Sequence, residues 1–171
     1  GKGFYKKTKD GILSVDFDTL EYTPQKRVRF DGYRVAKQQN TTGGRIRALA
    51  YSDDKAGQFF WEGMARTFIY TANRIPEISD DIVNIDNAMK WGYGYKLGIF
   101  ESWDAIGVRR SVNKMKDEGK SVPPWVERML DDGIESFYAI KNGKQTFYSL
   151  PDSAPREISP RDKEINLSLR K

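Results

Sequence analysis

Apolar residues recur every three or four positions through the middle of the chain, which is the spacing of an amphipathic helix. The clearest such helix is predicted over residues 55–74, and four of its apolar residues follow i, i+4 spacing: Phe60, Met64, Phe68 and Ala72. An aromatic stripe at this spacing is far more often core than a cofactor pocket, so we predict that it is buried. Pro76 ends the pattern because proline cannot continue a helix.

Shorter helical patterns lie on both sides of this segment. They are predicted over residues 33–39, from 45 to about 50, from 82 to a glycine break at 92–98, over 100–106, from 108 to 118, and from 124 to about 132. Ser79-Asp80-Asp81 provides capping residues for the helix that begins at 82. Pro123-Pro124 suits the first turn of the last helix, which turns four apolar residues inward: Trp125, Val126, Met129 and Leu130.

Alternating patterns near both ends predict short β-hairpins. Residues 12–17 are expected to pair with 21–24, and Asn142-Gly143 predicts a tight turn between 136–140 and 146–150. The charged, proline-containing stretch after Ser153 is interpreted as a tail or linker. The fold class is therefore mainly α, with short hairpins near both ends, and three regions are expected: 1–44, a helical domain over 45–150, and a tail over 151–171.

A weak internal repeat links the two hairpins. Gly3-Phe4-Tyr5 followed by Asp10-Gly11 resembles Ser136-Phe137-Tyr138 followed by Asn142-Gly143. Two similar endings about one domain apart suggest that residue 5 closes one repeat and residue 138 closes the next. The chain opens at Gly1 without a start methionine, and we expect it to be an excised piece of a longer protein that includes the end of a preceding helical unit.

Composition removes several classes of chemistry. The chain contains no histidine and no cysteine, so it lacks the commonest general base, the commonest metal ligand and any thiolate nucleophile. No catalytic and no metal-binding residue is therefore proposed. The composition argues against an enzyme that acts by itself. No apolar run approaches the length that spans a bilayer. We expect a cytoplasmic protein without a membrane partner.

Positive charge gathers in the first 50 residues. They hold 11 Lys+Arg and 5 Asp+Glu, a net of +6, whereas the remainder holds 18 and 19, a net of −1. Such a cluster can contact phosphates, but a solvated basic face is the simpler interpretation. Nucleic-acid binding is ranked last among the functions considered.

The stretch 85–107 combines glycines, aromatic residues and two carboxylates. Three glycines break one helix and a short apolar helix follows, so the two can fold tightly against each other. Glu101 and Asp104 lie at i, i+3, where two carboxylates could face one cleft. Binding to backbone amides, or pairing with Lys90 or Arg109, is the favoured interpretation because no partner group for chemistry is visible. Five aromatic residues are expected to cluster at the corner, some of them in the core: Trp91, Tyr93, Tyr95, Phe100 and Trp103.

This stretch resembles a signature of the C-terminal helical domain of 3-hydroxyacyl-CoA dehydrogenases. Met89-Lys90-x-Gly92-x-Gly94-Tyr95-x-x-Gly98-x-Phe100-Glu101-x-x-Asp104-x-x-Gly107 is similar to the family's M-K-x-G-x-G-Y-P-M-G-P-F-E-L-x-D-x-x-G. The resemblance covers residues 45–118 closely. Gly3-Phe4-Tyr5 resembles the G-x-G-F-Y that closes the first helical unit in longer members with two tandem units, some of which continue into an enoyl-CoA hydratase domain. The resemblance implies a fold of the 6-phosphogluconate dehydrogenase C-terminal-like type.

Some positions depart from the family. Its two usual prolines appear here as Lys96 and Ile99. The turn Asp54-Lys55-Ala56-Gly57 matches, but Trp61 stands where the single-unit enzymes have an active-site asparagine. The family's catalytic histidine and its glutamate partner belong to a nucleotide-binding domain that this chain does not contain.

The resemblance thus implies the non-catalytic helical part of an NAD-dependent enzyme of fatty-acid β-oxidation. NAD would bind the missing nucleotide-binding domain, and this part would help to form the acyl-CoA cleft and an interface with that domain, a tandem helical unit or a second subunit. The alternative is a purely structural interaction or dimerisation module without substrate contact. Candidates for the cleft or interface surface are Lys90, Trp91, Gly92, Gly94, Tyr95, Gly98, Phe100, Glu101 and Asp104.

Overall fold

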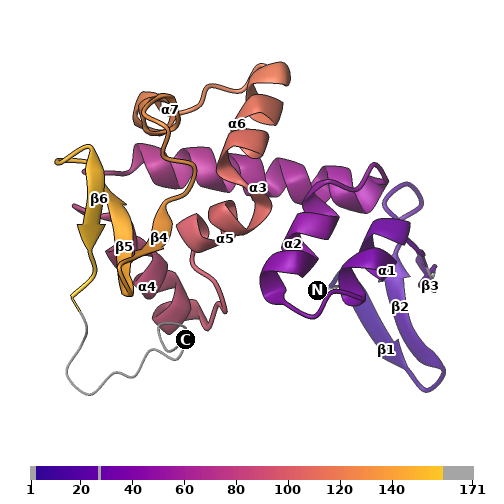
Figure 1. Ribbon diagram of the computed structural model, residues 1–171. Helices are drawn as coiled ribbons and strands as arrows, with labels where there is room; N and C mark the ends of the chain where they lie inside the picture. Colours follow the sequence, from indigo (N-terminus) through magenta and orange to yellow (C-terminus); the bar gives the residue numbers. More distant parts are fainter. Residues whose placement is uncertain (1–2, 27, 160–171) are drawn as a thin grey trace. The chain divides into compact units, whose positions relative to one another are not determined.

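The computed structural model describes residues 3–26 and 28–159. The chain divides into two compact units, one ending at Phe30 and one beginning at Asp31, and each is considered by itself (Figure 1). The second unit includes the helices over residues 31–37 and 42–50, because they pack against each other and both contact the helix over residues 55–73. Where the domains of a longer protein begin and end stays a prediction.

The first unit is a three-stranded antiparallel sheet in the order β1-β2-β3. Its strands are β1 (Tyr5–Thr8), β2 (Gly11–Val15) and β3 (Tyr22–Pro24). The predicted pairing of 12–17 with 21–24 is confirmed as β2 with β3. Sequence analysis missed β1, because Lys6-Lys7-Thr8 shows no apolar alternation; its backbone nevertheless pairs with β2 along its whole length.

The second unit holds seven helices among its described residues. They are α1 (Asp31–Lys37), α2 (Thr42–Ala50), α3 (Lys55–Asn73), α4 (Ile82–Tyr93), α5 (Ile99–Ile106), α6 (Val108–Asp117) and α7 (Pro124–Asp131). The predicted helices are therefore all present, and the mainly α class is confirmed. Several starts follow from capping, since the Asp54 and Asp81 carboxylates accept the amides of Gly57 and Asn84 at the beginnings of α3 and α4.

Helix α3 runs through the middle of this unit and α5 lies against it (Figure 1). The predicted stripe on α3 is only half right: Phe68 and Ala72 are buried, but Phe60 and Met64 are half-buried, and Trp61 and Ala65 take their places in the core. An i, i+4 row drifts by about 40° around the helix at each step, so it leaves the buried face after two or three residues.

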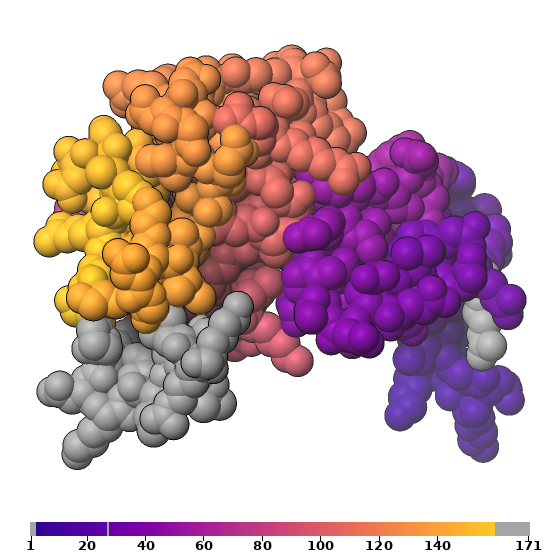
Figure 2. All heavy atoms as spheres, viewed as in Figure 1, coloured from indigo at the N-terminus to yellow at the C-terminus, as the bar shows by residue number. Residues whose placement is uncertain are grey.

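A second three-stranded antiparallel sheet, the closing sheet, ends the helical unit. Its strands are β4 (Tyr138–Lys141), β5 (Lys144–Ser149) and β6 (Ala154–Glu157), in the order β4-β5-β6. The Asn142-Gly143 turn is confirmed, and both residues have positive φ, 52° and 72°. The closing sheet and the helices α6 and α7 form one continuous surface in Figure 2.

Strand β6 is a correction to the expected tail. Its pairing with β5 satisfies the backbone of residues 154–157, a contribution that the local proline and charge content does not reveal. The rest of that expectation, from residue 160 onward, lies outside the described residues. Among the helices of the described part, none is long and apolar enough to cross a membrane.

Ile82 at the start of α4 and Ile78, which precedes the helix, differ in burial. Ile82 is fully buried and Ile78, four residues earlier, is mostly exposed. We expect Ile82→Ala to lower the free energy of unfolding by about 2–5 kcal/mol through lost burial and a residual cavity. The matched control Ile78→Ala should change it by less than about 0.5 kcal/mol. Urea denaturation followed by circular dichroism measures both, and similar losses would contradict the described core.

Candidate functional site

The corner between α4 and α5 is organised by a buried carboxylate that sequence analysis did not single out. Helix α5 begins after Gly98, which has no side chain to cap it. Asp86 of α4 supplies the missing acceptor, since its two carboxylate oxygens receive the amides of Phe100 and Glu101, each at 2.9 Å. These are the second and third amides of α5, so one helix caps the other.

Glu101 closes the same corner from the other side. Its carboxylate accepts the Gly98 amide at 2.7 Å and binds the Lys90 ammonium at 2.5 Å. The favoured interpretation of Glu101, backbone binding and pairing with Lys90, is therefore confirmed. Arg109, the other cation considered, pairs with Glu135 instead.

Asp104 ties α5 to the closing sheet. Its carboxylate accepts the amides of Phe137 and Tyr138 at 2.7 and 2.9 Å, just where β4 begins. The Tyr138 hydroxyl donates to Asp86 at 3.0 Å, so the two aspartates and the tyrosine connect α4, α5 and β4. We call Asp86, Glu101, Asp104 and Tyr138 the carboxylate cluster.

Burial shifts the titration of this cluster. Loss of hydration raises the pKa of Asp86 to about 6 and that of Asp104 to about 7, although the amides that donate to each of them act in the opposite direction. Neighbouring carboxylates also raise both values. Burial and the nearby Asp86 carboxylate raise the pKa of the Tyr138 hydroxyl as well, so that group stays protonated and donates.

Phe100 and Trp103 form the apolar side of this corner. Both are fully buried, and Phe137 packs edge-on against Phe100 with ring centroids 5.0 Å apart. The Trp103 indole also stacks on Phe68 at 4.8 Å and donates its N–H to the hydroxyl of Ser111. Of the five aromatics expected to cluster, these two are core.

The other three aromatics lie on the surface. Trp91, Tyr93 and Tyr95 are mostly exposed at the end of α4 and in the turn that follows, and the Tyr93 and Tyr95 rings lie 6.3 Å apart. Gly94 has a φ of +69° and ends α4 in the left-handed conformation. We call residues 91–95 the exposed corner.

The nine candidate residues thus fall into two groups. One is exposed, and it consists of Trp91, Gly92, Gly94 and Tyr95; the other is packed or bonded inside the corner, and it consists of Lys90, Gly98, Phe100, Glu101 and Asp104. Sequence analysis missed Asp86 and Tyr138. The available signal for Asp86 was a carboxylate at position i+4 from Ile82 on an apolar helix face, which demands hydrogen-bond partners once buried.

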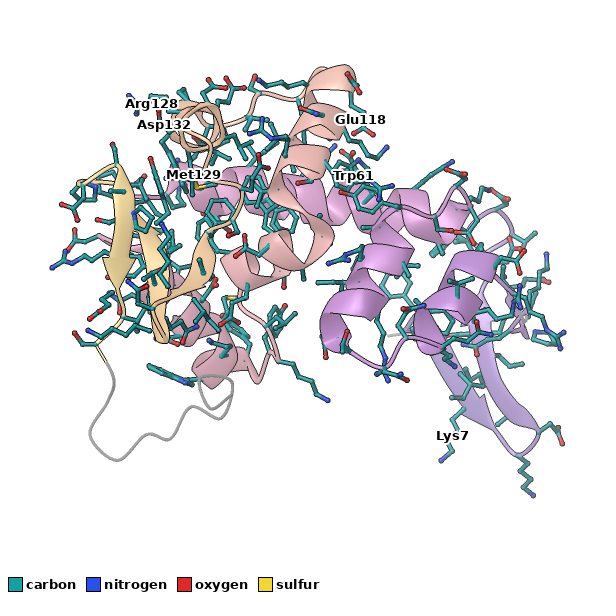
Figure 3. All side chains as sticks on the ribbon, in the orientation of Figure 1. Lys7, Trp61, Glu118, Arg128, Met129 and Asp132 are labelled. Atoms are coloured by element: carbon teal, nitrogen blue, oxygen red, sulfur yellow. The ribbon has the colours of Figure 1, made fainter. Side chains whose placement is uncertain are left out.

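Trp61 lies away from this corner, on α3, and its side chain contacts the end of α6. Its indole N–H donates to both carboxylate oxygens of Glu118, at 2.9 and 2.8 Å, and Figure 3 shows the two side chains side by side. Glu118 also pairs with Lys114 and Lys120. Trp61 and Glu118 lie at the edge of a cavity of about 630 Å³. Since these polar groups are bound to one another, they offer no free acid, base or nucleophile.

The carboxylates of the cluster hold the fold together through hydrogen bonds. Each carboxylate already accepts two or more hydrogen bonds from the chain. Among residues 3–26 and 28–159, no group of three or more Asp or Glu side chains could hold a metal ion. Of the nine candidate residues, those of the exposed corner are the ones accessible to a ligand or a partner.

The sequence is similar to those of known proteins. A "Probable 3-hydroxyacyl-CoA dehydrogenase" of Bacillus subtilis (strain 168) is 40% identical over 171 residues, which is the whole of this chain and 21% of that protein. This chain is related to one segment of a 3-hydroxyacyl-CoA dehydrogenase. It spans about a fifth of the length of that relative.

Two further relatives of this chain are each named "Putative fatty acid oxidation complex trifunctional enzyme". The protein of Rickettsia felis is 42% identical over 53 residues, 31% of this chain and 7% of that protein. The protein of Rickettsia prowazekii is 29% identical over 106 residues, 58% of this chain and 13% of that protein. No family model and no solved structure matches the chain.

The three glycines between α4 and α5 have different roles, and a series of alanine substitutions separates them. A Cβ at Gly98 would collide with the Asp86 side chain, so Gly98→Ala should cost about 3 kcal/mol or more through overpacking and a broken cap. At Gly94 there is open space but a positive φ, and about 1 kcal/mol is expected. Gly92 is helical with open space around it, so alanine should stabilise by up to about 1 kcal/mol.

Equilibrium denaturation of the three variants tests this order. Equal losses at the three positions would mean that the glycines act as one flexible hinge. A silent Gly98→Ala would remove the argument that Asp86 caps α5.

The raised pKa of Asp104 predicts a distinctive pH dependence. A carboxylate with a folded-state pKa above its unfolded value contributes stability that is fully present below about pH 4 and is lost as pH rises through about 7. The free energy of unfolding of the native segment, minus that of Asp104→Asn, should therefore fall by about 2 kcal/mol or more between pH 5 and pH 8.

The subtraction is needed because other carboxylates act oppositely. Hydrogen bonds from Gly57 and Gly32 lower the pKa of Asp54, and hydrogen bonds from Lys120 and Arg66 lower that of Glu62, so both favour folding at higher pH. Urea titrations at four pH values measure the difference. A difference that is flat or rises with pH would contradict the assignment.

Proposed function

We propose that this chain is the non-catalytic C-terminal helical part of an NAD-dependent 3-hydroxyacyl-CoA dehydrogenase of fatty-acid β-oxidation. In the whole enzyme it would help to form the acyl-CoA cleft and an interface with another domain or subunit, and it would act in the cytoplasm. The observation that carries the proposal is the 40% identity to the Bacillus subtilis dehydrogenase over all 171 residues. The mainly helical unit supports the family's 6-phosphogluconate dehydrogenase C-terminal-like fold.

The lack of histidine in the sequence and the hydrogen bonding of the carboxylate cluster support a non-catalytic role. There is no histidine, and the carboxylates of the cluster are bound to backbone amides, to Lys90 and to Tyr138. NAD does not fit the described residues either. A dinucleotide site is built at the edge of a parallel sheet, whereas both sheets here are antiparallel. NAD would therefore bind a different domain of the enzyme, and the catalytic base would belong to that domain.

The exposed corner is the part of the chain best suited to the cleft. Its backbone is held by the Asp86 cap and the Gly94 turn, so its aromatic side chains stand on a rigid base. Exposed tyrosines offer apolar area together with a polar hydroxyl, a combination enriched at binding surfaces. Lys90, Gly98, Phe100, Glu101 and Asp104 then position this surface, whereas Tyr95 and its neighbours would contact the acyl-CoA or the adjoining domain.

Oxidation of NADH by acetoacetyl-CoA tests the proposal. We expect no turnover from this chain alone and restored turnover when it is mixed with the nucleotide-binding part of its parent enzyme. Turnover by the chain alone would contradict a non-catalytic role. Turnover by the nucleotide-binding part that does not change on mixing would favour the alternative, a structural module.

Substitution at the exposed corner distinguishes substrate contact from a structural role. In the whole enzyme, Tyr95→Ala should raise KM for acetoacetyl-CoA about three- to tenfold with kcat nearly unchanged, because it removes binding that is equal in the ground and transition states. Tyr33→Ala, which removes a similarly exposed tyrosine of α1, is the matched control. Unchanged KM in both variants would favour the alternative, an interaction or dimerisation module without substrate contact.

A further inference from the structure

The cavity between α3 and α6 combines two aromatic rings with side chains of both charges. Trp61 is 4% exposed, and its ring lies against that of Tyr51 with centroids 6.0 Å apart. Three cations and four carboxylates also line this cavity of about 630 Å³, so its net charge is negative. Aromatic residues and arginine among polar side chains are typical of protein–protein interfaces, whereas pockets for small molecules are lined mostly by apolar groups. The composition of the cavity therefore favours a protein segment as its occupant.

Most of the charged groups in the cavity are bound to one another. Glu118 accepts the Trp61 N–H and pairs with Lys114 and Lys120, and Lys120 also pairs with Glu62. These contacts hold α3 and α6 together. The five groups therefore do not need a partner from outside the chain.

Arg110 is held in place without a carboxylate. Its guanidinium lies 3.6 Å from the centre of the Tyr51 ring, and its exposed side chain lines the cavity. The neighbouring Arg109 pairs with Glu135, whereas within residues 3–26 and 28–159 no carboxylate forms an ion pair with Arg110. Stacking fixes the planar guanidinium before a partner arrives, so less entropy is lost when it forms hydrogen bonds to an incoming carboxylate.

Asp117 presents the opposite charge two turns further along α6. It follows Arg110 by seven residues, which places both on one side of the helix and about 10 Å apart along its axis. Asp117 also lines the cavity, and no ion pair in the described part of the chain includes it. A partner that suits the cavity therefore offers a carboxylate and a cation at this separation. Free phosphate offers only negative charge, which the carboxylates of the cavity oppose.

We propose that a segment from another domain of the longer polypeptide occupies this cavity, and that an acidic side chain of the segment pairs with Arg110. A lysine or arginine of the same segment would reach Asp117. The Bacillus subtilis relative has further sequence that could supply such a segment, since this chain matches 21% of it. The cavity is then an interface built from different elements than the exposed corner.

The proposal rests on one part of the proposed function, namely that this chain adjoins another domain. It does not depend on the oxidation of a substrate. Cross-links and arginine accessibility test the docking, whereas turnover on mixing tests the enzymatic role, so either can fail while the other stands.

Carbodiimide cross-linking of the full-length protein tests the pairing. The reagent joins a carboxylate to an amine in contact with it, so Arg110→Lys places a reactive group at the required position. We expect mass spectrometry to find a cross-link from position 110 to an aspartate or glutamate outside residues 1–171. The matched control Arg128→Lys, at an exposed position of α7, should give no cross-link to that residue.

The Lys114–Glu118 pair is an internal standard for this experiment, because its cross-link shows in each variant that the reagent works. With that cross-link present, the absence of any cross-link from position 110 would overturn the proposal. Cross-links from position 110 only to carboxylates within these 171 residues would overturn it too.

Modification of arginine by phenylglyoxal tests occupancy without a substitution. In the full-length protein Arg110 should react about tenfold more slowly than in this 171-residue chain, because the segment covers it. Arg128 should react at similar rates in both forms. Equal rates for Arg110 in the two forms would contradict the proposal. Slower reaction of Arg110 in this chain on addition of inorganic phosphate would also contradict it, since the cavity would then be a site for a free anion.

Discussion

The helical unit depends on two buried aspartates that each bind two backbone amides. Asp86 receives the second and third amides of α5, and Asp104 receives the amides of Phe137 and Tyr138, where β4 begins. A buried carboxylate without partners would cost several kcal/mol, so each one selects the geometry that satisfies it. Helix α5, which carries the glycine-rich corner at one end, is thereby attached to both α4 and the closing sheet. The exposed corner lies between the two helices that Asp86 joins.

This arrangement explains why a motif rich in carboxylates and glycines has no visible catalytic group. Glu101 is bound to Lys90 and Gly98, and Asp104 to the beginning of β4. Gly98 is required for close packing on Asp86, whereas Gly94 is required for a left-handed turn. The residues conspicuous in the sequence serve mainly to hold the corner in place. The surface they hold in place, Trp91 to Tyr95, is where the proposed contact with acyl-CoA or a neighbouring domain would occur.

Local patterns in the sequence predict most of the fold but not its long-range contacts. Helix positions follow from apolar spacing, from Asp54 and Asp81 as caps, and from Pro76 and Pro124. The Asn142-Gly143 hairpin is predicted because two residues with positive φ need such side chains. Strands β1 and β6 are not predicted, since their stability comes from pairing with a central strand rather than from their own composition. Asp86 is missed for a related reason: its partners lie 14 and 15 residues away, and only the packed corner brings them together.

The two three-stranded sheets are more similar in structure than in sequence. Phe4-Tyr5 and Phe137-Tyr138 are a two-residue similarity in the sequence, yet the strand register and the positive φ of Leu20 and Ser153 agree at an offset of 133 residues.

The central claim of this account is that the carboxylates of the corner position the structure and do not take part in catalysis. Asp86→Asn in the full-length enzyme tests it most directly, with the free energy of unfolding and kcat measured on the same preparation. The account predicts lower stability with kcat within about twofold of the native value while the protein is folded. A hundredfold loss of kcat at unchanged stability would contradict it.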